Sequence, residues 1–237
     1  MNRYCRQIQF PPFGETGQRT LARATVSIIG CGGLGTQQAE TLARMGVGTI
    51  RLADFDLVTE HNLHRQHLFL QSDCGQPKVL AAARHLREIN PACRIETVQE
   101  RIEDIGVFAG GSSAVLDATD SVPTRFALND WCVRNRVPYV YGGVAGAEGM
   151  VLPVAPQANS PCLRCLYPQP PAESLGVATS GIWPPLVSQI ATLQVTLLVK
   201  LLMGDQSILG RLYLFNAWEM TLRTIRLEPR PGCSHGN

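Results

Sequence analysis

The segment from Val26 to Asp56, VSIIGCGGLGTQQAETLARMGVGTIRLADFD, constrains the fold more than any other part of the chain. It holds an apolar run, a glycine-rich turn, a helix-like stretch, a second apolar run and then acidic residues. This order is typical of the strand–turn–helix–strand unit that binds nucleotides in doubly wound α/β proteins. We predict strands at 25–29 and 49–53, with a helix at 34–45 between them.

Strand and helix patterns continue to alternate after this unit, with further helices expected at 76–89 and 122–135. The additional predicted strands are 94–98, 114–118, 138–141, 149–154, 211–216 and 221–226. The last three lie too close in sequence for crossover connections, so we expect them to pair antiparallel around a long apolar helix. The predicted fold is a Rossmann-like α/β fold: a mainly parallel sheet with helices on both faces, extended by antiparallel strands in the C-terminal third.

The length of 237 residues, 45% of them hydrophobic, is appropriate for one domain spanning residues 1–237. We divide it into an N-terminal arm (1–24), a nucleotide-binding half (25–142) and a C-terminal half (143–237). The C-terminal half contains a Pro-, Ser- and Gly-rich loop at 155–181. Connections this long inside a compact domain are usually functional or mobile.

The formal net charge is only +2, and the basic residues form no run. This distribution argues against nucleic acid and against anionic membranes as partners. The apolar stretch that begins at Pro185 contains Ser188, Gln189 and Lys200, so it predicts a buried helix and not a membrane span. The first ten residues lack the apolar core of a secretory signal, and we expect a cytoplasmic protein.

The glycine-rich turn predicts a phosphate-binding loop. Its glycines allow the backbone to turn sharply and to approach phosphates closely, and the following helix offers free amides to negative charge. Asp54 comes at the end of the second predicted strand, where a ribose hydroxyl is bound in such folds. These features predict a nucleotide but do not choose between NAD, FAD and ATP. The glycines are Gly30, Gly32, Gly33 and Gly35.

Polar and cationic residues beyond the acid favour ATP. Asn62, Arg65 and Gln66 follow it closely, and Lys78 stands near the start of the next predicted helix. A dinucleotide pyrophosphate carries about two negative charges and can be bound largely by helix amides. An ATP tail carries about four and usually recruits cations and Mg²⁺.

Two acids, Asp117 and Asp120, lie at the carboxyl end of the strand predicted at 114–118. Open α/β sheets bind ligands at this edge. Mg²⁺ typically uses one or two carboxylates together with substrate phosphates, so Asp120 is a candidate magnesium ligand. An acid directly before a helix can equally be its N-cap, and the two roles are compatible.

Seven segments together resemble one family of adenylating enzymes: RYCRQ, GCGGLG, GVGTIRLADFD, NLHRQ, GQPK, LDATDS and PCLRC. They occur in the order, and nearly at the spacing, of the MoeB/ThiF family of molybdopterin and thiamine-thiazole biosynthesis, which is related to ubiquitin-activating enzymes. The resemblance runs from Arg3 to about Cys233.

The resemblance implies that the chain adenylates the C-terminal carboxylate of a small ubiquitin-like sulfur carrier protein ending in Gly-Gly, using ATP and Mg²⁺ and releasing pyrophosphate. It implies a homodimer in which Arg6 serves the partner subunit's site. The implied catalytic residues are Arg6, Arg65, Lys78 and Asp120, with Asp120 holding magnesium. The residues assigned to ATP are Gly30, Gly32, Gly33, Gly35, Asp54, Asp56, Asn62, Arg65, Gln66, Lys78, Asp120 and Ser121.

The chain departs from the family in the loop before the late helix. Some members carry a cysteine there that receives a sulfur or acyl group, whereas this chain has Val177 or a neighbour at that place and no cysteine between Leu166 and Cys233. We therefore expect the chemistry to stop at the adenylate. Cys74 is an alternative nucleophile, although packing explains this residue more simply.

The second departure concerns zinc. Family members with a four-thiolate site pair one C-x-x-C with another near the C-terminus, and structural zinc takes four ligands. Here Cys162, Cys165 and Cys233 are present, but Gly236 occupies the place of the fourth cysteine. His235 would complete a zinc site of three thiolates and one imidazole. A metal-free thiol cluster fits the same sequence.

Three other functions fit parts of the sequence. An adenylating enzyme that modifies a peptide or another carboxylate in natural-product biosynthesis would share the ATP site. An NAD-linked oxidoreductase would use the glycine loop but not Arg65, Lys78 or Asp120. A catalytically silent binding subunit would keep the fold without pyrophosphate exchange.

Overall fold

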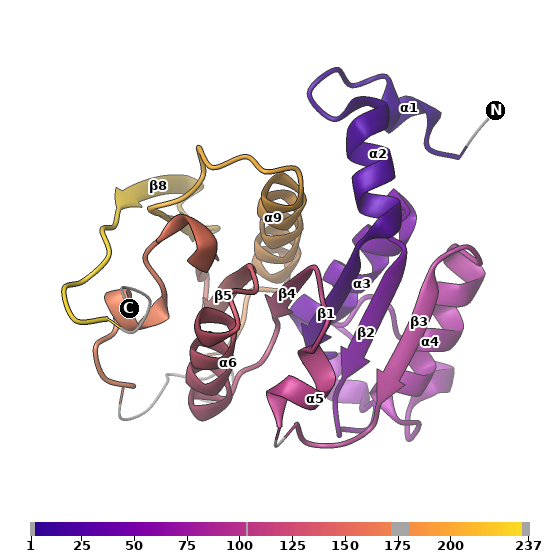
Figure 1. The fold of residues 1–237 in the computed structure, drawn as a ribbon. Coiled ribbons are helices and arrows are strands. Elements are labelled where there is room, and N and C mark those ends of the chain that lie inside the picture. Colours follow the sequence, from indigo (N-terminus) through magenta and orange to yellow (C-terminus); the bar gives the residue numbers. More distant parts are fainter. Residues whose placement is uncertain (1–2, 103, 172–180, 234–237) are drawn as a thin grey trace.

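The fold is built on one eight-stranded sheet with the order β3-β2-β1-β4-β5-β6-β7-β8 (Figure 1). The structure is a computed structural model, and it describes residues 3–102, 104–171 and 181–233. The strands are β1 (Thr25–Ile29), β2 (Thr49–Ala53), β3 (Arg94–Val98), β4 (Ala114–Asp117), β5 (Tyr139–Ala145), β6 (Glu148–Val154), β7 (Arg211–Asn216) and β8 (Thr221–Arg226).

The first five strands run parallel and the last three pairings are antiparallel. This arrangement confirms the predicted Rossmann-like sheet with an antiparallel extension. Strand β5 continues to Ala145, past the predicted end at Tyr141. Strand β5 pairs with β6 from Tyr139 opposite Val154 to Ala145 opposite Glu148. This pairing includes Gly142 and Gly143. Glycines disfavour strands locally, so only the partner strand explains the extra length.

The helices cover both faces of the sheet (Figure 1). Short 3-10 turns occupy Glu60–Asn62, Gln71–Asp73 and Pro156–Ala158. Among the described helices, α1, α2, α5 and α7 lie where no helix was predicted; α1, α5 and α7 have only four or five residues, too few for a helical period to be visible in the sequence. The helices are α1 (Cys5–Ile8), α2 (Gly14–Arg23), α3 (Gly33–Met45), α4 (Lys78–Ile89), α5 (Ile105–Ala109), α6 (Val122–Arg134), α7 (Leu163–Leu166) and α9 (Pro184–Leu202).

Two hydrophobic cores hold the layers together. One lies between the sheet and helices α2, α3, α4 and α9, and the other between the opposite face and helices α5, α6 and α7. Helix α9 is long and apolar enough to cross a membrane by composition, but half of its most apolar window is buried inside the protein. It packs against α3, β5 and β6, which confirms the predicted buried helix.

The strand order places a crevice at the carboxyl ends of β1 and β4. The chain moves from β1 to β2 and β3 on one side, and returns to β4 and β5 on the other. Loops that leave two adjacent strands in opposite directions open a crevice, and open α/β sheets bind ligands there. The glycine loop follows β1, and the segment from Asp117 to Ser121 follows β4.

Candidate active site

The glycine loop lies in the crevice and packs against the end of β4. Gly30 has a φ of +97°, and a Cβ at this position would lie 2.5 Å from the carbonyl oxygen of Ala118. A Cβ at Gly35 would collide with the carbonyl of Gly30. Glycine is therefore required at both positions, for the turn and for the close approach. Helix α3 begins at Gly33 without a side-chain cap, so its first amides are available to an anion.

Asp54 connects the glycine loop to the end of β2. Its Oδ2 accepts a 2.6 Å hydrogen bond from the amide of Cys31, and its Oδ1 accepts one of 2.8 Å from the amide of Asp56. A carboxylate has about four acceptor positions, so two amide donors leave room for ribose hydroxyls. The two amides fix the orientation of the carboxylate before any ligand arrives.

Arg65 is held in place by Asn62. The Nη2 of Arg65 donates to Oδ1 of Asn62 at 2.7 Å, and Nδ2 of Asn62 donates to Thr59 Oγ1 at 2.6 Å. Burial lowers the pKa of Arg65, and the charge of Asp120 opposes this shift. The pre-oriented guanidinium loses little freedom on binding phosphate. Asn62 thus holds the Arg65 side chain in position.

Lys78 is buried, and its ammonium lies 2.8 Å from Oδ2 of Asp56. Helix α4 begins at Lys78 itself, two residues later than predicted, because Pro77 is its N-cap. The backbone amide of Lys78 also donates to the carbonyl of Asp56. Asp56 therefore supports Lys78 from both backbone and side chain.

The two acids after β4 have different environments. Asp117 is 1% exposed; its Oδ1 accepts from the amide of Thr119, and its Oδ2 lies 3.7 Å from Nε of Arg125. Burial raises the pKa of Asp117, and Arg125 opposes the shift. Asp120 is exposed and, among the described residues, makes no hydrogen bond or ion pair. The alternative that Asp120 caps the next helix is wrong, because Ser121 is the N-cap of α6.

The residues assigned to ATP from the sequence line one cavity of about 480 Å³, with the exception of Gly35. Gln66 is 3% exposed, and its Oε1 is buried without a hydrogen-bond partner in the described structure. Its amide group faces the glycine loop, since a Cβ at Gly32 would lie 3.8 Å from Gln66 Nε2. An orphaned polar atom at this position favours a polar ligand in the cavity.

Arg6 lies at the opposite end of the sheet from this cavity. Its helix α1 contacts the far end of α3, where Gln7 Nε2 donates to the carbonyl of Met45 at 2.7 Å. The 13 residues of α3 separate that carbonyl from the glycine loop, a distance of about 20 Å along the helix. The guanidinium of Arg6 donates instead to Gln9. Arg6 therefore does not reach the cavity of its own chain.

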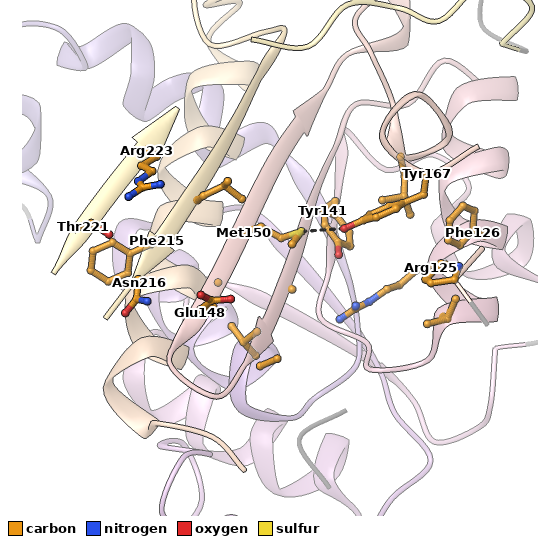
Figure 2. Close-up of a pocket in the computed structure, with 18 of the residues that line it drawn as sticks. Arg125, Phe126, Tyr141, Glu148, Met150, Tyr167, Phe215, Asn216, Thr221 and Arg223 are labelled. Atoms are coloured by element: carbon orange, nitrogen blue, oxygen red, sulfur yellow. Dashed lines mark hydrogen bonds between the residues drawn. The ribbon is translucent and has the colours of Figure 1, made fainter. Parts of the chain in front are cut away.

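A second hollow of about 550 Å³ adjoins the nucleotide cavity and shares Arg125 and Val144 with it. We call it the groove. Figure 2 shows Tyr141, Met150 and Tyr167 together on one part of its wall, with Glu148 and Asn216 on the far side from Arg125. Its other large apolar residues are Phe126, Leu163, Leu214 and Phe215.

Arg125 stands where the groove meets the nucleotide cavity. Its Nε and Nη2 donate to the carbonyl of Thr119, and its guanidinium lies 5.4 Å from the centroid of the Tyr141 ring. Burial raises the pKa of Tyr141 to about 12. Neither Arg125 nor the groove was predicted from the sequence. The only signal for Arg125 was a basic residue on the helix after LDATDS, and its partners Thr119 and Tyr141 lie on other elements.

Three of the eight cysteines form a cluster beside α7. The sulfur atoms of Cys162, Cys165 and Cys233 lie within 4.8 Å of one another. The Cys162–Cys233 separation is 3.7 Å, and sulfurs around zinc at about 2.3 Å are spaced about 3.8 Å apart in a tetrahedron. The amide of Arg230 donates to Cys165 Sγ. Burial raises the pKa of Cys162, and the two neighbouring thiols add to the shift.

The cluster fits zinc as three of its four ligands. His235, the predicted fourth ligand, lies outside the described residues, as does Val177 in the loop before α9. Cys74 is half-buried and packs against the core, in agreement with a packing role.

A cationic cavity at the switch point of a doubly wound sheet, joined to an apolar groove, defines a nucleotide-binding α/β protein with space for a second ligand. The chain matches the ThiF family over residues 4–235. It belongs to this family, as the sequence motifs predicted.

Several relatives match nearly the whole chain. One is the SAMP-activating enzyme E1 of Haloferax volcanii, which is 35% identical over 98% of this chain and 87% of its own length. Another is the molybdopterin-synthase adenylyltransferase of Salmonella typhimurium, 37% identical over 98% of this chain and 95% of its own length. The fold is also similar to that of E. coli MccB in complex with MccA-N7isoASN, with a TM-score of 0.87 at 22% identity, over 100% of this chain and 75% of that one.

Proposed function

We propose that this protein catalyses the ATP-dependent adenylation of the C-terminal carboxylate of a small ubiquitin-like sulfur carrier protein ending in Gly-Gly. The products are an acyl-adenylate and pyrophosphate, and the enzyme works in the cytoplasm as a homodimer. The observation that carries the proposal is the junction at Arg125 and Val144, where the nucleotide cavity and the groove meet. A chain end lying in the groove would present its carboxylate to the nucleotide.

The groove suits an extended, flexible tail. Its walls are largely aromatic and aliphatic, whereas Glu148, Glu219 and Arg223 supply charge away from the nucleotide cavity. Apolar walls with a few polar groups are the usual composition of a specific binding site. The last two residues of the proposed carrier are glycines, which carry no side chains. A tail of this kind is narrow enough to pass Tyr141 and reach the nucleotide cavity.

The reaction requires charge neutralisation more than proton transfer. A C-terminal carboxylate has an ordinary pKa of about 3.5, so it is ionised at neutral pH and needs no general base. Its oxygen attacks the α-phosphorus, the bond from this phosphorus to the bridging oxygen breaks, and pyrophosphate leaves with the electron pair. Lys78 and Arg65 bind the polyphosphate, and Asp54 binds the ribose.

Asp120 would hold Mg²⁺ in this proposal. Its carboxylate lines the cavity without a partner among the described residues, which fits a ligand to a hard cation. Bound Mg²⁺ supplies neutralisation of the charge that develops on pyrophosphate. Arg125 orients the incoming carboxylate by attraction of opposite charges, and its bonds to the carbonyl of Thr119 fix its position.

The position of Arg6 supports the proposed homodimer. This residue cannot serve the cavity of its own chain, and an arginine finger supplied by a partner is worth about 10³ or more in rate in phosphoryl transfer. A two-fold dimer would give each site one Arg6 from the other subunit. Zinc at the cysteine cluster would be structural, because the cluster does not line the nucleotide cavity.

ATP–pyrophosphate exchange tests the proposal. The purified protein is incubated with labelled pyrophosphate, ATP, Mg²⁺ and a candidate carrier, and the controls are the same carrier without its last glycine and a short free peptide. The proposal predicts exchange only with the intact carrier. Exchange with the peptide alone would favour the natural-product alternative. Absence of exchange with a complete panel of Gly-Gly carriers would refute the proposed activity.

A further inference from the structure

Arg6 lies on a short arm that its own backbone cannot hold in one place. Helix α1 has only four residues, Cys5–Ile8, with no side-chain cap and no buried residue. A single helical turn of this kind is unstable by itself, because it orders several residues for very few hydrogen bonds. Contacts with the rest of the chain therefore determine where Arg6 lies.

Gln7 attaches the arm to the end of α3. Its Nε2 donates to the carbonyl of Met45, the last residue of α3, at 2.7 Å, and also to Oε1 of Gln18 on α2. Nε2 of Gln18 donates to the same carbonyl at 3.2 Å. Carbonyls in the last turn of a helix lack a partner within the helix, so this one can accept both amides. The helix that begins at the glycine loop thus carries the arm at its other end.

Tyr4 attaches the arm at a second point, between α3 and α4. Its ring packs on Gly46, directly after α3, where a Cβ would lie 2.5 Å from the ring. Its hydroxyl accepts a 2.9 Å hydrogen bond from Nδ2 of Asn90, which directly follows α4. Asn90 is 2% exposed and also donates to the carbonyl of Ala43. Residues on both sides of Arg6 in the sequence are therefore attached to helix ends.

Arg6 itself takes no part in this attachment. Its side chain is exposed, and within the described part of the chain its guanidinium makes one hydrogen bond, 3.3 Å long, to Oε1 of Gln9 on the same arm. An exposed cation without an acidic partner among those residues remains available to an anionic site on another subunit. The arm thus combines two firmly attached residues with one free cation.

We propose that Gln7 and Tyr4 are positioning residues: they attach the arm so that Arg6 reaches the phosphates in the cavity of the partner subunit. Neither residue lines the cavity or the groove of its own chain, so both act through Arg6. A misplacement of about 1 Å at a catalytic group can cost about a hundredfold in rate. The inference rests on the proposed function, since Arg6 has this task only in the proposed homodimer.

The test measures carrier-dependent ATP–pyrophosphate exchange and ATP binding. Gln7→Ala should lower kcat by about tenfold or more, because the arm loses one attachment, and should change the Kd for ATP by less than about twofold. Tyr4→Ala should behave in the same way, whereas Tyr4→Phe, which keeps the ring on Gly46, should retain most of the rate. Asn135→Ala is the matched control, since Nδ2 of Asn135 also donates to a carbonyl in the last turn of a helix, that of Trp131 in α6. This variant should keep the wild-type rate.

Co-refolding of Gln7→Ala with an equal amount of Lys78→Ala shows which site the arm serves. In a mixed dimer, the site with intact Lys78 receives the arm with intact Gln7, so the mixture should reach about a quarter of wild-type activity. If Gln7 served the site of its own subunit, the mixture would stay near about a twentieth.

That lower value would overturn the inference, and so would an unchanged kcat in both Gln7→Ala and Tyr4→Ala. In both cases wild type still shows exchange, so the proposed adenylation stands without the positioning role. Wild type that shows no exchange with any Gly-Gly carrier would remove the proposed function, and the inference with it.

Discussion

The ammonium of Lys78 lies 2.8 Å from the carboxylate of Asp56, and the two side chains differ in exposure, with 5% for Lys78 and 49% for Asp56. The buried cation therefore has one half-exposed anion as its partner in the nucleotide-free protein. ATP phosphates would supply a second anion at the same place. Asp56 thus serves as a counter-charge that orients the Lys78 side chain in the absence of phosphates.

Asp56→Asn should destabilise the free protein more than the ATP-bound protein. Loss of the partner of a buried charge costs about 2 kcal/mol, which corresponds to a fall in Tm of about 4–8 °C for a chain of this size. With saturating Mg-ATP the phosphates replace the lost charge, so the fall should be smaller. Differential scanning calorimetry with and without ATP measures both. Glu15→Gln, which breaks the exposed Arg19–Glu15 pair, should change Tm by about 1 °C or less. Equal losses in both conditions would argue against this role of Asp56.

The variants Arg6→Ala and Lys78→Ala should each be inactive alone. Mixing the two should restore activity, because mixed dimers form. In a mixed dimer, the site with intact Lys78 receives an intact Arg6 from the other subunit. Random association of equal amounts gives about a quarter of wild-type activity in a two-fold dimer. The measurement is pyrophosphate exchange after co-refolding. Lys78→Ala mixed with Asp120→Asn is the control, because both changes affect the same site and no intact site can form. Failure of the first mixture to recover would contradict an Arg6 contribution in trans.

Met150→Trp should block the groove and leave the nucleotide cavity open. Met150 lines the groove but not the nucleotide cavity, and Figure 2 shows it beside Tyr141. The larger ring fills space that the carrier tail needs, so the KM for the carrier should rise by about tenfold or more, whereas the Kd for ATP stays constant. Met203→Trp, at the half-exposed end of α9, serves as the control. An unchanged KM in Met150→Trp would place the tail elsewhere.

The cysteine cluster should hold about one zinc ion per chain, measured by inductively coupled plasma mass spectrometry. Cys162→Ser should lose the metal and lower Tm, because the remaining two thiolates give an incomplete site. Cys93→Ser is the matched control: Cys93 is also buried but lies outside the cluster, so this variant should lose stability and keep the metal. A zinc content near zero in wild type, expressed with zinc in the medium, would show that the cluster does not bind zinc.

The nucleotide half was largely predictable because its signals are local. Gly30, the turn, α3 and Asp54 fall within one continuous segment, and the strand–helix alternation predicted parallel strands, whereas their order came from the structure. Arg65 and Lys78 were candidates from their charge and position, whereas the assignment of Arg6 came from the resemblance to a family alone. The structure added the supporting contacts, such as Asn62 on Arg65, which depend on local turn geometry.

The groove was not predictable because its wall is assembled from distant parts of the chain. Arg125 comes from α6, Tyr141 from β5, Met150 from β6 and Leu214 from β7. None of these residues stands in a motif, and apolar residues in strands usually indicate core. The antiparallel extension of the sheet brings them together, and only the three-dimensional arrangement places Arg125 between groove and cavity.

The most direct measurement of the central claim is the intact mass of the carrier protein after incubation with enzyme, ATP and Mg²⁺. The carrier should become heavier by one AMP group, which hydroxylamine removes, and no mass increase should occur with Lys78→Ala enzyme or with a carrier that lacks its final glycine. An unchanged carrier mass with folded, ATP-bound enzyme would show that the carrier is not adenylated.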